Sequence, residues 1–168
     1  MAVELRRIRD DEWSELRDLR LRALSDAPDA FTATYEREVQ EPEQLWRGWA
    51  ADGAEGGSSI TVVAVDDGRW IGMAMGAPHR DHPGEAGLFA MWVDPVARGS
   101  GLAGRLVEEV VRWARSGGFP VLRLRVTGNN DAAVRLYERV GFSDEGPRIP
   151  LREGSDVMTM TMTMGLSV

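Results

Sequence analysis

The sequence contains no cysteine and no lysine among its 168 residues, and each absence removes a class of chemistry. Without a thiol, the chain forms no disulfide, offers no cysteine nucleophile and builds no thiolate metal site. All 20 basic residues are arginines, so no lysine side chain is available for a Schiff base or for acetylation of the protein by itself. Catalysis must therefore rely on hydroxyl groups, carboxylates, two histidines or the backbone.

Long apolar runs and net positive charge are also missing. No stretch approaches the roughly 20 apolar residues of a membrane-spanning helix, and residues 1–10 are too charged for a signal peptide. The formal net charge of −7 argues against nucleic acid as the main partner, because phosphate binding needs net or clustered positive charge. We therefore expect one cytoplasmic domain, residues 1–168, with neither a nucleic-acid nor a membrane partner.

Residues 88–142 carry the strongest pattern. Apolar spacing and turn residues predict a strand at 88–93, a glycine-rich segment at 98–104, a helix, a strand at 121–126 and a second helix that begins near Asn130. A glycine-rich turn between a strand and a helix is typical of an anion site.

The glycine-rich segment RGSGLAG favours binding of a phosphate group. The first amides of a helix have no partner within the helix and carry partial positive charge. Glycine lets a phosphate approach the backbone because no Cβ stands in the way. We expect a pyrophosphate to contact the amides of Arg98, Gly99, Gly101 and Ala103, with the side chains of Arg98 and Arg105 as charge partners. The alternative, a turn whose glycines only permit packing, is disfavoured by the flanking strand and helix.

The same glycines, Gly99-x-Gly101-x-x-Gly104, also satisfy the fingerprint of dinucleotide-binding folds. Three observations disfavour that interpretation. The glycines come six residues after the strand, no acidic residue closes the next strand, and too little chain follows Val126 for the rest of such a sheet.

Two motifs resemble one known family. Arg98-x-x-Gly101-x-Ala103 fits the (Gln/Arg)-x-x-Gly-x-(Gly/Ala) motif of the GCN5-related N-acetyltransferase (GNAT) family. Downstream, the chain reads Asn130-x-x-Ala133-x-x-Leu136-Tyr137-Glu138-x-x-Gly141-Phe142, which is similar to the second signature of that family. The two motifs together are specific, and the resemblance covers most of the chain.

The resemblance implies an α/β (α+β) fold: a mixed, mostly antiparallel central sheet with helices on both faces, splayed at the cofactor. It also implies acetyl-CoA as acyl donor, with the pyrophosphate on the turn and the pantetheine arm along the strand. The implied donor-binding residues are Met91, Trp92, Val93, Arg98, Gly99, Ser100, Gly101, Leu102, Ala103, Gly104, Arg105, Asn130, Ala133 and Tyr137.

The function that we expect is direct transfer of an acetyl group to a primary amine, either of a small molecule or of a peptide N-terminus. An acidic protein suits a cationic small molecule, although net charge does not describe the pocket. The alternative is a non-catalytic module that binds acyl-CoA or dimerises, and a homodimer is compatible with both.

Two side chains are candidates for catalysis. Tyr137 lies near the CoA sulfur in the resembled family, and a tyrosine, with a pKa of about 10, is protonated at neutral pH and can donate a proton to the leaving thiolate. Its alternative role is that of a core aromatic residue. Glu85 precedes the central strand, where a carboxylate can accept a proton from an incoming ammonium through water; it is otherwise an exposed glutamate. We expect no metal, because His79 and His82 lie on a polar loop without a supporting ligand set.

The outer segments give weaker signals. Arg17, Arg20 and Arg22 are expected on the solvated face of a helix that ends at Pro28. In the resembled family the next segment covers the acceptor, so Phe31 and Tyr35 either line a substrate pocket or anchor the loop. We further expect an aperiodic segment at 29–40, a flexible loop at 51–59, hairpin strands at 60–65 and 70–77, and a polar loop at 78–87. A final strand is expected at 157–164, with its methionines on one buried face or, alternatively, on a pliable surface for a dimer partner or a ligand.

Overall fold

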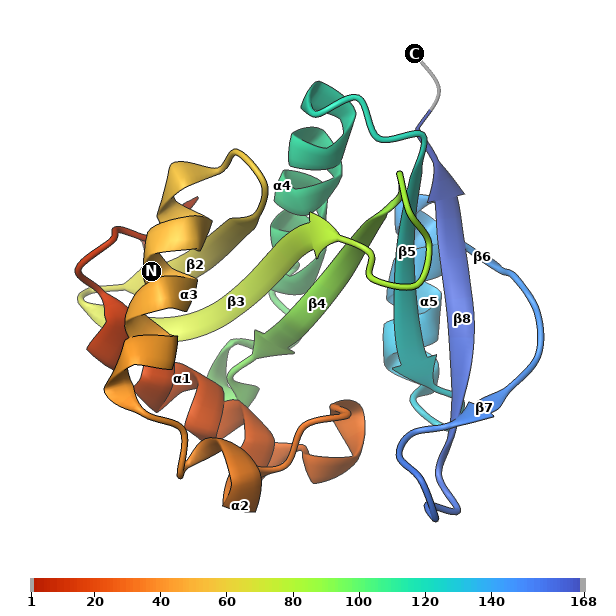
Figure 1. Cartoon of the computed structure of the whole chain (residues 1–168), viewed down its shortest axis with the longest axis horizontal. Coiled ribbons are helices and arrows are strands. Elements are labelled where there is room, and N and C mark those ends of the chain that lie inside the picture. The colour runs from red at the N-terminus through yellow and green to blue at the C-terminus, as the bar shows by residue number, and fades with distance from the viewer. Residues whose placement is uncertain (1, 167–168) are drawn as a thin grey trace.

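The computed structural model describes residues 2–166 and contains one sheet with helices on both faces (Figure 1). Its strands are β1 (Val3–Arg7), β2 (Ile60–Asp66), β3 (Arg69–Pro78), β4 (Ala86–Val93), β5 (Val121–Thr127), β6 (Ser143–Asp144), β7 (Ile149–Pro150) and β8 (Met158–Gly165). Its α-helices are α1 (Trp13–Asp26), α2 (Tyr35–Glu38), α3 (Glu43–Glu55), α4 (Leu102–Ser116) and α5 (Asp131–Val140). Two 3-10 turns are present, η1 (Pro28–Ala30) and η2 (Pro95–Ala97).

The sheet is mostly antiparallel, as predicted. Its order is β1-β2-β3-β4-β5-β8-β6, with β7 also paired to β8, and only β4 and β5 run parallel. These two strands are bridged at two positions, Ala86 with Leu122 and Gly87 with Arg123. Toward their carboxyl ends the strands diverge (Figure 1), so the sheet is splayed there.

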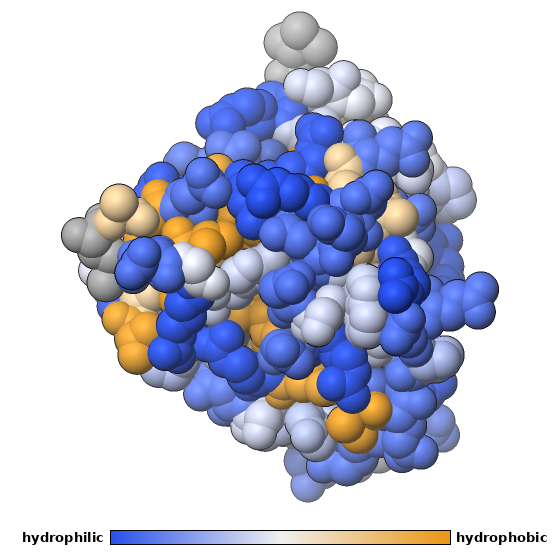
Figure 2. Space-filling view, turned by 90° about the vertical axis from the view of Figure 1, so that its left-hand side faces the viewer, coloured by the Kyte–Doolittle hydropathy of each residue, from blue (hydrophilic) through white to orange (hydrophobic). Residues whose placement is uncertain are grey.

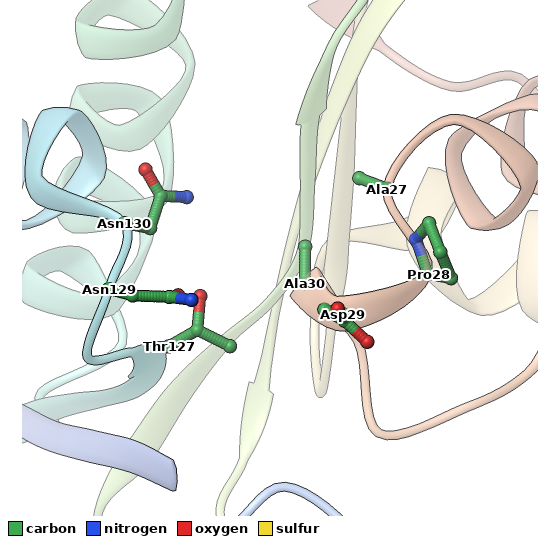
Figure 3. A pocket seen from close by; sticks show the side chains of 7 residues that line it. All are labelled: Ala27, Pro28, Asp29, Ala30, Thr127, Asn129 and Asn130. Atoms are coloured by element: carbon green, nitrogen blue, oxygen red, sulfur yellow. The ribbon is translucent and has the colours of Figure 1, made fainter. Parts of the chain in front are cut away.

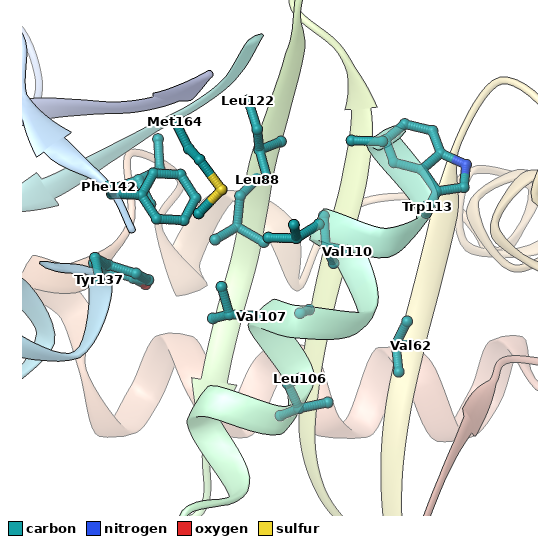
Figure 4. Packing of buried hydrophobic residues seen from close by; sticks show 14 of the residues in the cluster. Val62, Leu88, Leu106, Val107, Val110, Trp113, Leu122, Tyr137, Phe142 and Met164 are labelled. Atoms are coloured by element: carbon teal, nitrogen blue, oxygen red, sulfur yellow. The ribbon is translucent and has the colours of Figure 1, made fainter. Parts of the chain in front are cut away.

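The face of the sheet that carries α4 and α5 is tightly packed. Leu106, Val107 and Val110 of α4 are completely buried against it, as their helical spacing predicts (Figure 4). At Gly76 of β3, a Cβ would lie 2.8 Å from the ring of Trp113, so only glycine allows this approach of helix and sheet. The helix is thereby fixed behind the splayed strands.

The opposite face is covered by α1 and α3. Leu16, Leu19 and Trp46 are completely buried there against strand residues such as Val63 and Met73. Alternation along the strands divides the side chains between the two faces, because successive residues of a strand point to opposite sides.

Several predicted boundaries are wrong. Residues 51–55 continue α3 rather than forming a loop, and the segment at 29–40 contains η1 and α2. The predicted polar loop at 78–87 is shorter, since β3 reaches Pro78 and β4 begins at Ala86. The predicted alternation in β8 is only partly reflected in burial: Met162 and Met164 are buried, but Met158 is 41% exposed and Thr159 is buried.

The side of the molecule that lies on the left in Figure 1 is largely hydrophilic, with apolar patches interrupted by polar side chains (Figure 2). Within residues 2–166, no helix has both the length and the apolar character needed to cross a bilayer.

Candidate active site

The opening between β4 and β5 coincides with an irregularity of the backbone. Met73 of β3 pairs with Trp92 and Met75 pairs with Phe89, so β4 carries an extra residue between these positions. Ala90 within this bulge has a φ of 54°, which is uncommon for a residue other than glycine. A bulge interrupts the hydrogen-bond ladder and redirects backbone groups, here beside the opening.

The three predicted residues on β4 lie on different faces. Met91 and Val93 pack with the cluster under α4. The side chain of Trp92 points to α1, where its indole Nε1 donates to Oδ2 of Asp26 over 3.0 Å. Only Met91 and Val93 therefore share the face that carries the glycine-rich turn and α4.

The glycine-rich turn has the open backbone that an anion site requires. Gly99 and Gly101 have φ values of 80° and 84°, and no heavy atom lies within 4 Å of the place where either Cβ would stand. Helix α4 begins at Leu102, so its first amides have no carbonyl one turn earlier within the helix. The Arg105 amide is bonded to the Gly101 carbonyl at 3.3 Å. Arg105 itself is exposed and makes no ion pair with the part of the chain that the structure describes.

Arg98, which we expected to contact a pyrophosphate through its amide and side chain, uses both groups within the protein. Its amide donates to the carbonyl of Pro95, and its guanidinium binds the Val93 carbonyl through Nε (3.0 Å) and Oδ2 of Asp26 through Nη2 (2.6 Å). The side chain thus braces the start of the turn against β4 and α1. Ser100 is also used locally, since its hydroxyl donates to the Ala97 carbonyl at 2.5 Å.

Gly104 faces a helix rather than the opening. A Cβ at this position would lie 3.6 Å from Cδ1 of Leu136, an ordinary contact with α5. Its φ is also not among the positive values. The third glycine of the motif therefore has no conformational need to be glycine.

Tyr137 lies deep between the helices and the sheet. It is 7% exposed, and its ring meets that of Phe142 edge to face at 5.8 Å. Figure 4 shows it on the α5 side of the cluster, across from Val107 of α4. Burial raises the pKa of the Tyr137 hydroxyl, which keeps it protonated at neutral pH.

Asn130 and Ala133 are explained by helix capping. The Asn130 side-chain oxygen accepts a hydrogen bond from the Ala133 amide at 3.2 Å, which satisfies one of the free amides of α5. The amide group of Asn130 lies at the pocket described below.

Glu85 is at the other end of β4. Its Oε1 is 2.8 Å from Nε of Arg123, next to the two positions where β4 and β5 are still paired. Five residues lie between Glu85 and Met91, so the two positions are roughly 20 Å apart along the strand. Glu85 is therefore far from the bulge and from the end of β4 that leads into the turn.

The two histidines lie on the same loop as Glu85, with ring centroids 4.9 Å apart. Among residues 2–166, no group of three or more histidine, aspartate or glutamate side chains comes together in a way that could hold a metal ion.

Two pockets flank the turn η1 at the opening. The first, the inner pocket, lies between η1 and the segment after β5 and is lined by Ala27, Pro28, Asp29, Ala30, Thr127, Asn129 and Asn130 (Figure 3). The second, the outer pocket, is lined by Leu24, Ser25, Pro28, Asp29, Thr34, Tyr35, Glu36 and Arg152. Of the two aromatic residues that we considered for the acceptor, Tyr35 lines a pocket, whereas Phe31 is buried under the guanidinium of Arg20.

The arginines of α1 are not a solvated face, contrary to the prediction. Arg20 is buried and its Nε lies 2.9 Å from Oε1 of Glu38 on α2. Arg22 forms an ion pair with Asp94, which is also bound by Arg69 at 3.2 Å. These partners lie 18 and 72 residues away along the chain, so no local pattern in the sequence indicates them.

The roles of Asp26 and Asp94 could not be predicted from the sequence either, because their partners also lie far away along the chain. The Trp92 indole, followed by the guanidinium of Arg98, lowers the pKa of Asp26 despite partial desolvation. For Asp94, burial acts to raise the pKa, but the Val96 amide and the two guanidinium groups outweigh it and the pKa is lowered. Both carboxylates are therefore ionised braces between α1 and the end of β4.

Comparison with known proteins identifies the family. The model of the acetyltransferase (GNAT) family matches residues 7–142. A mycothiol acetyltransferase of Rhodococcus opacus is 35% identical over 123 residues, which cover 71% of this chain and 38% of that protein. The N-alpha-acetyltransferase RimI of Mycobacterium tuberculosis is 38% identical over 88 residues, which cover 51% of this chain and 54% of RimI. The chain spans less than half of the mycothiol acetyltransferases that it matches.

Solved structures agree on the fold. A GNAT acetyltransferase from Streptococcus pneumoniae superposes with a TM-score of 0.84 at 21% identity and covers 99% of this chain and 100% of its own. The Salmonella typhimurium protein yncA, described with its cofactor acetyl-CoA, superposes with a TM-score of 0.82 at 18% identity and covers 100% of this chain and 96% of its own.

Proposed function

The chain belongs to the acetyltransferase (GNAT) family, and from this premise we propose that it transfers an acetyl group from acetyl-CoA to a primary amine. The observation that carries the proposal is the juxtaposition of two features. The splayed strands β4 and β5 open beside the start of α4, where Gly99 and Gly101 leave the backbone accessible. The gap between the strands suits the extended pantetheine arm, and the accessible backbone at the helix start suits a phosphate group.

The residues of the turn suit the anionic part of acetyl-CoA. The amides at the start of α4 and the exposed guanidinium of Arg105 would hold the pyrophosphate. When bound, the thioester supplies an acyl group that is already activated for attack by an amine. Arg98 contributes by fixing the start of the turn through its contacts with Val93 and Asp26.

Backbone and tyrosine supply the remaining chemistry. The bulge at Ala90 frees β4 from regular pairing, so an amide near Met91 is available to stabilise an oxyanion. The protonated hydroxyl of Tyr137 donates a proton to the departing thiolate. Because the chain has no cysteine, transfer takes place directly from donor to amine.

The catalytic assignment rests on Tyr137 rather than Glu85. The Glu85 carboxylate is held by Arg123 at the closed end of β4. A role as proton acceptor would require it to act through water over the length of the strand.

Calorimetric titration with acetyl-CoA, with NAD as the control, tests donor binding. Binding of acetyl-CoA alone is expected, and binding of NAD instead would support the dinucleotide interpretation. Thiol release in the presence of amines then separates an enzyme from a non-catalytic acyl-CoA-binding module. Donor binding without amine-dependent thiol release would identify the module and refute the proposed activity.

A further inference from the structure

The two pockets around η1 indicate which kind of amine the site accepts. Their linings share Pro28 and Asp29, so this single turn separates an inner from an outer compartment. The inner pocket lies at the opening between β4 and β5 (Figure 3). The outer pocket reaches α2 through Tyr35 and Glu36. A molecule that occupies both must pass Asp29.

The carboxylates that line these pockets have no ion-pair partner in the part of the chain that the structure describes, unlike other carboxylates nearby. Among residues 2–166, Asp29 is the one charged residue that lines the inner pocket, and the outer pocket is lined by Asp29, Glu36 and Arg152. Both side chains are exposed, and neither makes an ion pair within residues 2–166. Nearby carboxylates differ, since Asp26 binds Arg98 and Glu38 binds Arg20.

Arg152 does not neutralise the two pocket carboxylates directly. Its guanidinium donates to the carbonyls of Pro28 (2.7 Å), Thr32 (3.0 Å) and Phe31 (3.1 Å), so it braces the backbone around η1. Ser25, Thr34 and Tyr35 line the outer pocket together with Leu24 and Pro28, so its wall mixes hydroxyl-bearing and apolar residues. Carboxylates on such a mixed wall suit a small cationic compound whose carbon chain lies against the apolar residues.

We propose that the acceptor is a small polar diamine, with the reacting nitrogen beside Asp29 in the inner pocket and the second ammonium beside Glu36 in the outer pocket. This inference rests on the proposed acetyltransferase activity. A three-residue 3-10 turn spans roughly 6 Å, which sets the scale of the separation between the two nitrogens.

The chemistry of transfer explains the need for a second charge. The reacting nitrogen must be neutral when its lone pair attacks the acyl carbon, so a monoamine loses its attraction to a carboxylate at that step. A diamine keeps its second ammonium beside Glu36 before and during reaction. As the N–C bond forms and the C–S bond breaks, the nitrogen releases a proton to solvent and the thiolate takes one from Tyr137, which solvent reprotonates.

Thiol release from acetyl-CoA with matched amines tests this inference. Putrescine is compared with butylamine, which has the same carbon chain and one nitrogen, and with a short peptide that begins with alanine. We expect kcat/KM for putrescine to exceed that for butylamine by about fivefold, the size of one favourable ion pair near a surface. Equal values for the two amines, or a preference for the peptide, would overturn the diamine assignment.

Variants that each remove one carboxylate test which residue causes the preference for putrescine over butylamine. Glu36→Gln should abolish the preference for putrescine and leave butylamine unchanged. Asp29→Asn should lower kcat/KM for both amines, because the reacting nitrogen becomes positive again as the N–C bond forms and Asp29 stabilises that charge. Glu15→Gln and Asp18→Asn remove the same charges from exposed sites on α1 that line neither pocket, and should change neither value. An equal loss for both amines in Glu36→Gln would contradict the proposal.

A binding measurement separates this inference from the proposed function. Putrescine is titrated into the protein saturated with CoA, and binding that weakens about fivefold in Glu36→Gln is expected. Absence of binding overturns the diamine assignment even if peptides are acetylated. Binding of putrescine without any thiol release would instead refute the acetyltransferase activity while leaving the diamine site supported.

Discussion

The two sides of the opening are built in different ways. The proposed donor side is made from one continuous stretch, in which β4 leads through η2 and the glycine-rich turn into α4. The proposed acceptor side combines the end of α1, η1 and α2 with Arg152, which lies more than 110 residues further along the chain. The first side exposes backbone, whereas the second exposes side chains.

The difference between the two sides matches a difference in what each is proposed to bind, a common phosphate group or one particular amine. Backbone amides at a helix start can bind any phosphate, and few side chains need to be specified. Recognition of one amine depends on individual carboxylates and hydroxyls, held by long-range contacts such as those of Arg152. The comparison predicts that variants on one side change donor binding while variants on the other change the use of amines.

The largest effect is expected from Gly101→Glu. The new carboxylate would occupy the open space at the turn and repel a pyrophosphate, so calorimetry should detect no binding of acetyl-CoA. Gly118→Glu is the matched control, because Gly118 has a φ of 78°, open surroundings and the same backbone strain, but lies at the other end of α4. If Gly101→Glu binds acetyl-CoA with unchanged affinity, the turn is not the donor site.

The second largest effect is expected from Tyr137→Phe. Loss of the proton donor is expected to lower kcat by about 100-fold, with little change in the affinity for acetyl-CoA. The phenylalanine keeps the edge-to-face contact with Phe142, which guards against a packing effect. Undiminished turnover would show that Tyr137 is only a core residue.

The pH dependence of stability offers an independent check on Tyr137. Its pKa is raised in the folded protein, so the unfolded chain loses this proton first as the pH rises. The contribution is fully present below about pH 10 and is lost above it. Urea unfolding between about pH 8 and pH 11 should show a steeper alkaline loss of stability for the native protein than for Tyr137→Phe.

On the acceptor side, Arg152→Met should have an intermediate effect. The variant removes three hydrogen bonds to the backbone around η1, which is expected to lower kcat/KM for the amine about tenfold through misplacement of the pocket wall. Affinity for acetyl-CoA should stay the same. Arg148→Met is the control, because it removes only exposed contacts away from both pockets, the ion pair with Asp144 and a hydrogen bond to the Gly146 carbonyl. A weaker donor affinity in Arg152→Met would remove the proposed division between the two sides.

The smallest effect is expected from Gly104→Ala. The added Cβ meets Leu136 at an ordinary contact distance, so donor affinity should change less than about twofold. Thermal unfolding should show a stabilised protein, because alanine is favoured over glycine in a helix by about 0.8–1.0 kcal/mol. A large loss of donor affinity would mean that the third glycine contacts the donor after all.

The local structure of the proposed donor side could be predicted from the sequence, whereas that of the proposed acceptor side could not, because the first depends on neighbouring residues and the second on contacts between distant segments. The turn and α4 are specified by neighbouring residues, and the buried face formed by Leu106, Val107 and Val110 follows from spacing alone. Arg98 shows the limit, since its motif predicted a phosphate contact but not the brace to Asp26, 72 residues away. Roles set by contacts between distant segments leave no periodic signal.

Two further misses have the same physical origin. Arg20 follows the pattern of a solvated arginine, yet it is buried because Glu38, Phe31 and Trp49 surround it. Thr159 in the alternating strand β8 is buried because it is hydrogen-bonded to the Ile149 carbonyl and covered by Arg125. Tertiary contacts in both cases override local patterning.

The restricted pairing of β4 with β5 also has a mechanical consequence. The two halves of the sheet are joined by bridges at Ala86 and Gly87, at one end of strands that diverge for the rest of their length. A rotation of a few degrees about these bridges would move the far ends by on the order of 1 Å over a lever of roughly 20 Å. The geometry of the paired end therefore determines the width of the gap at the diverging end.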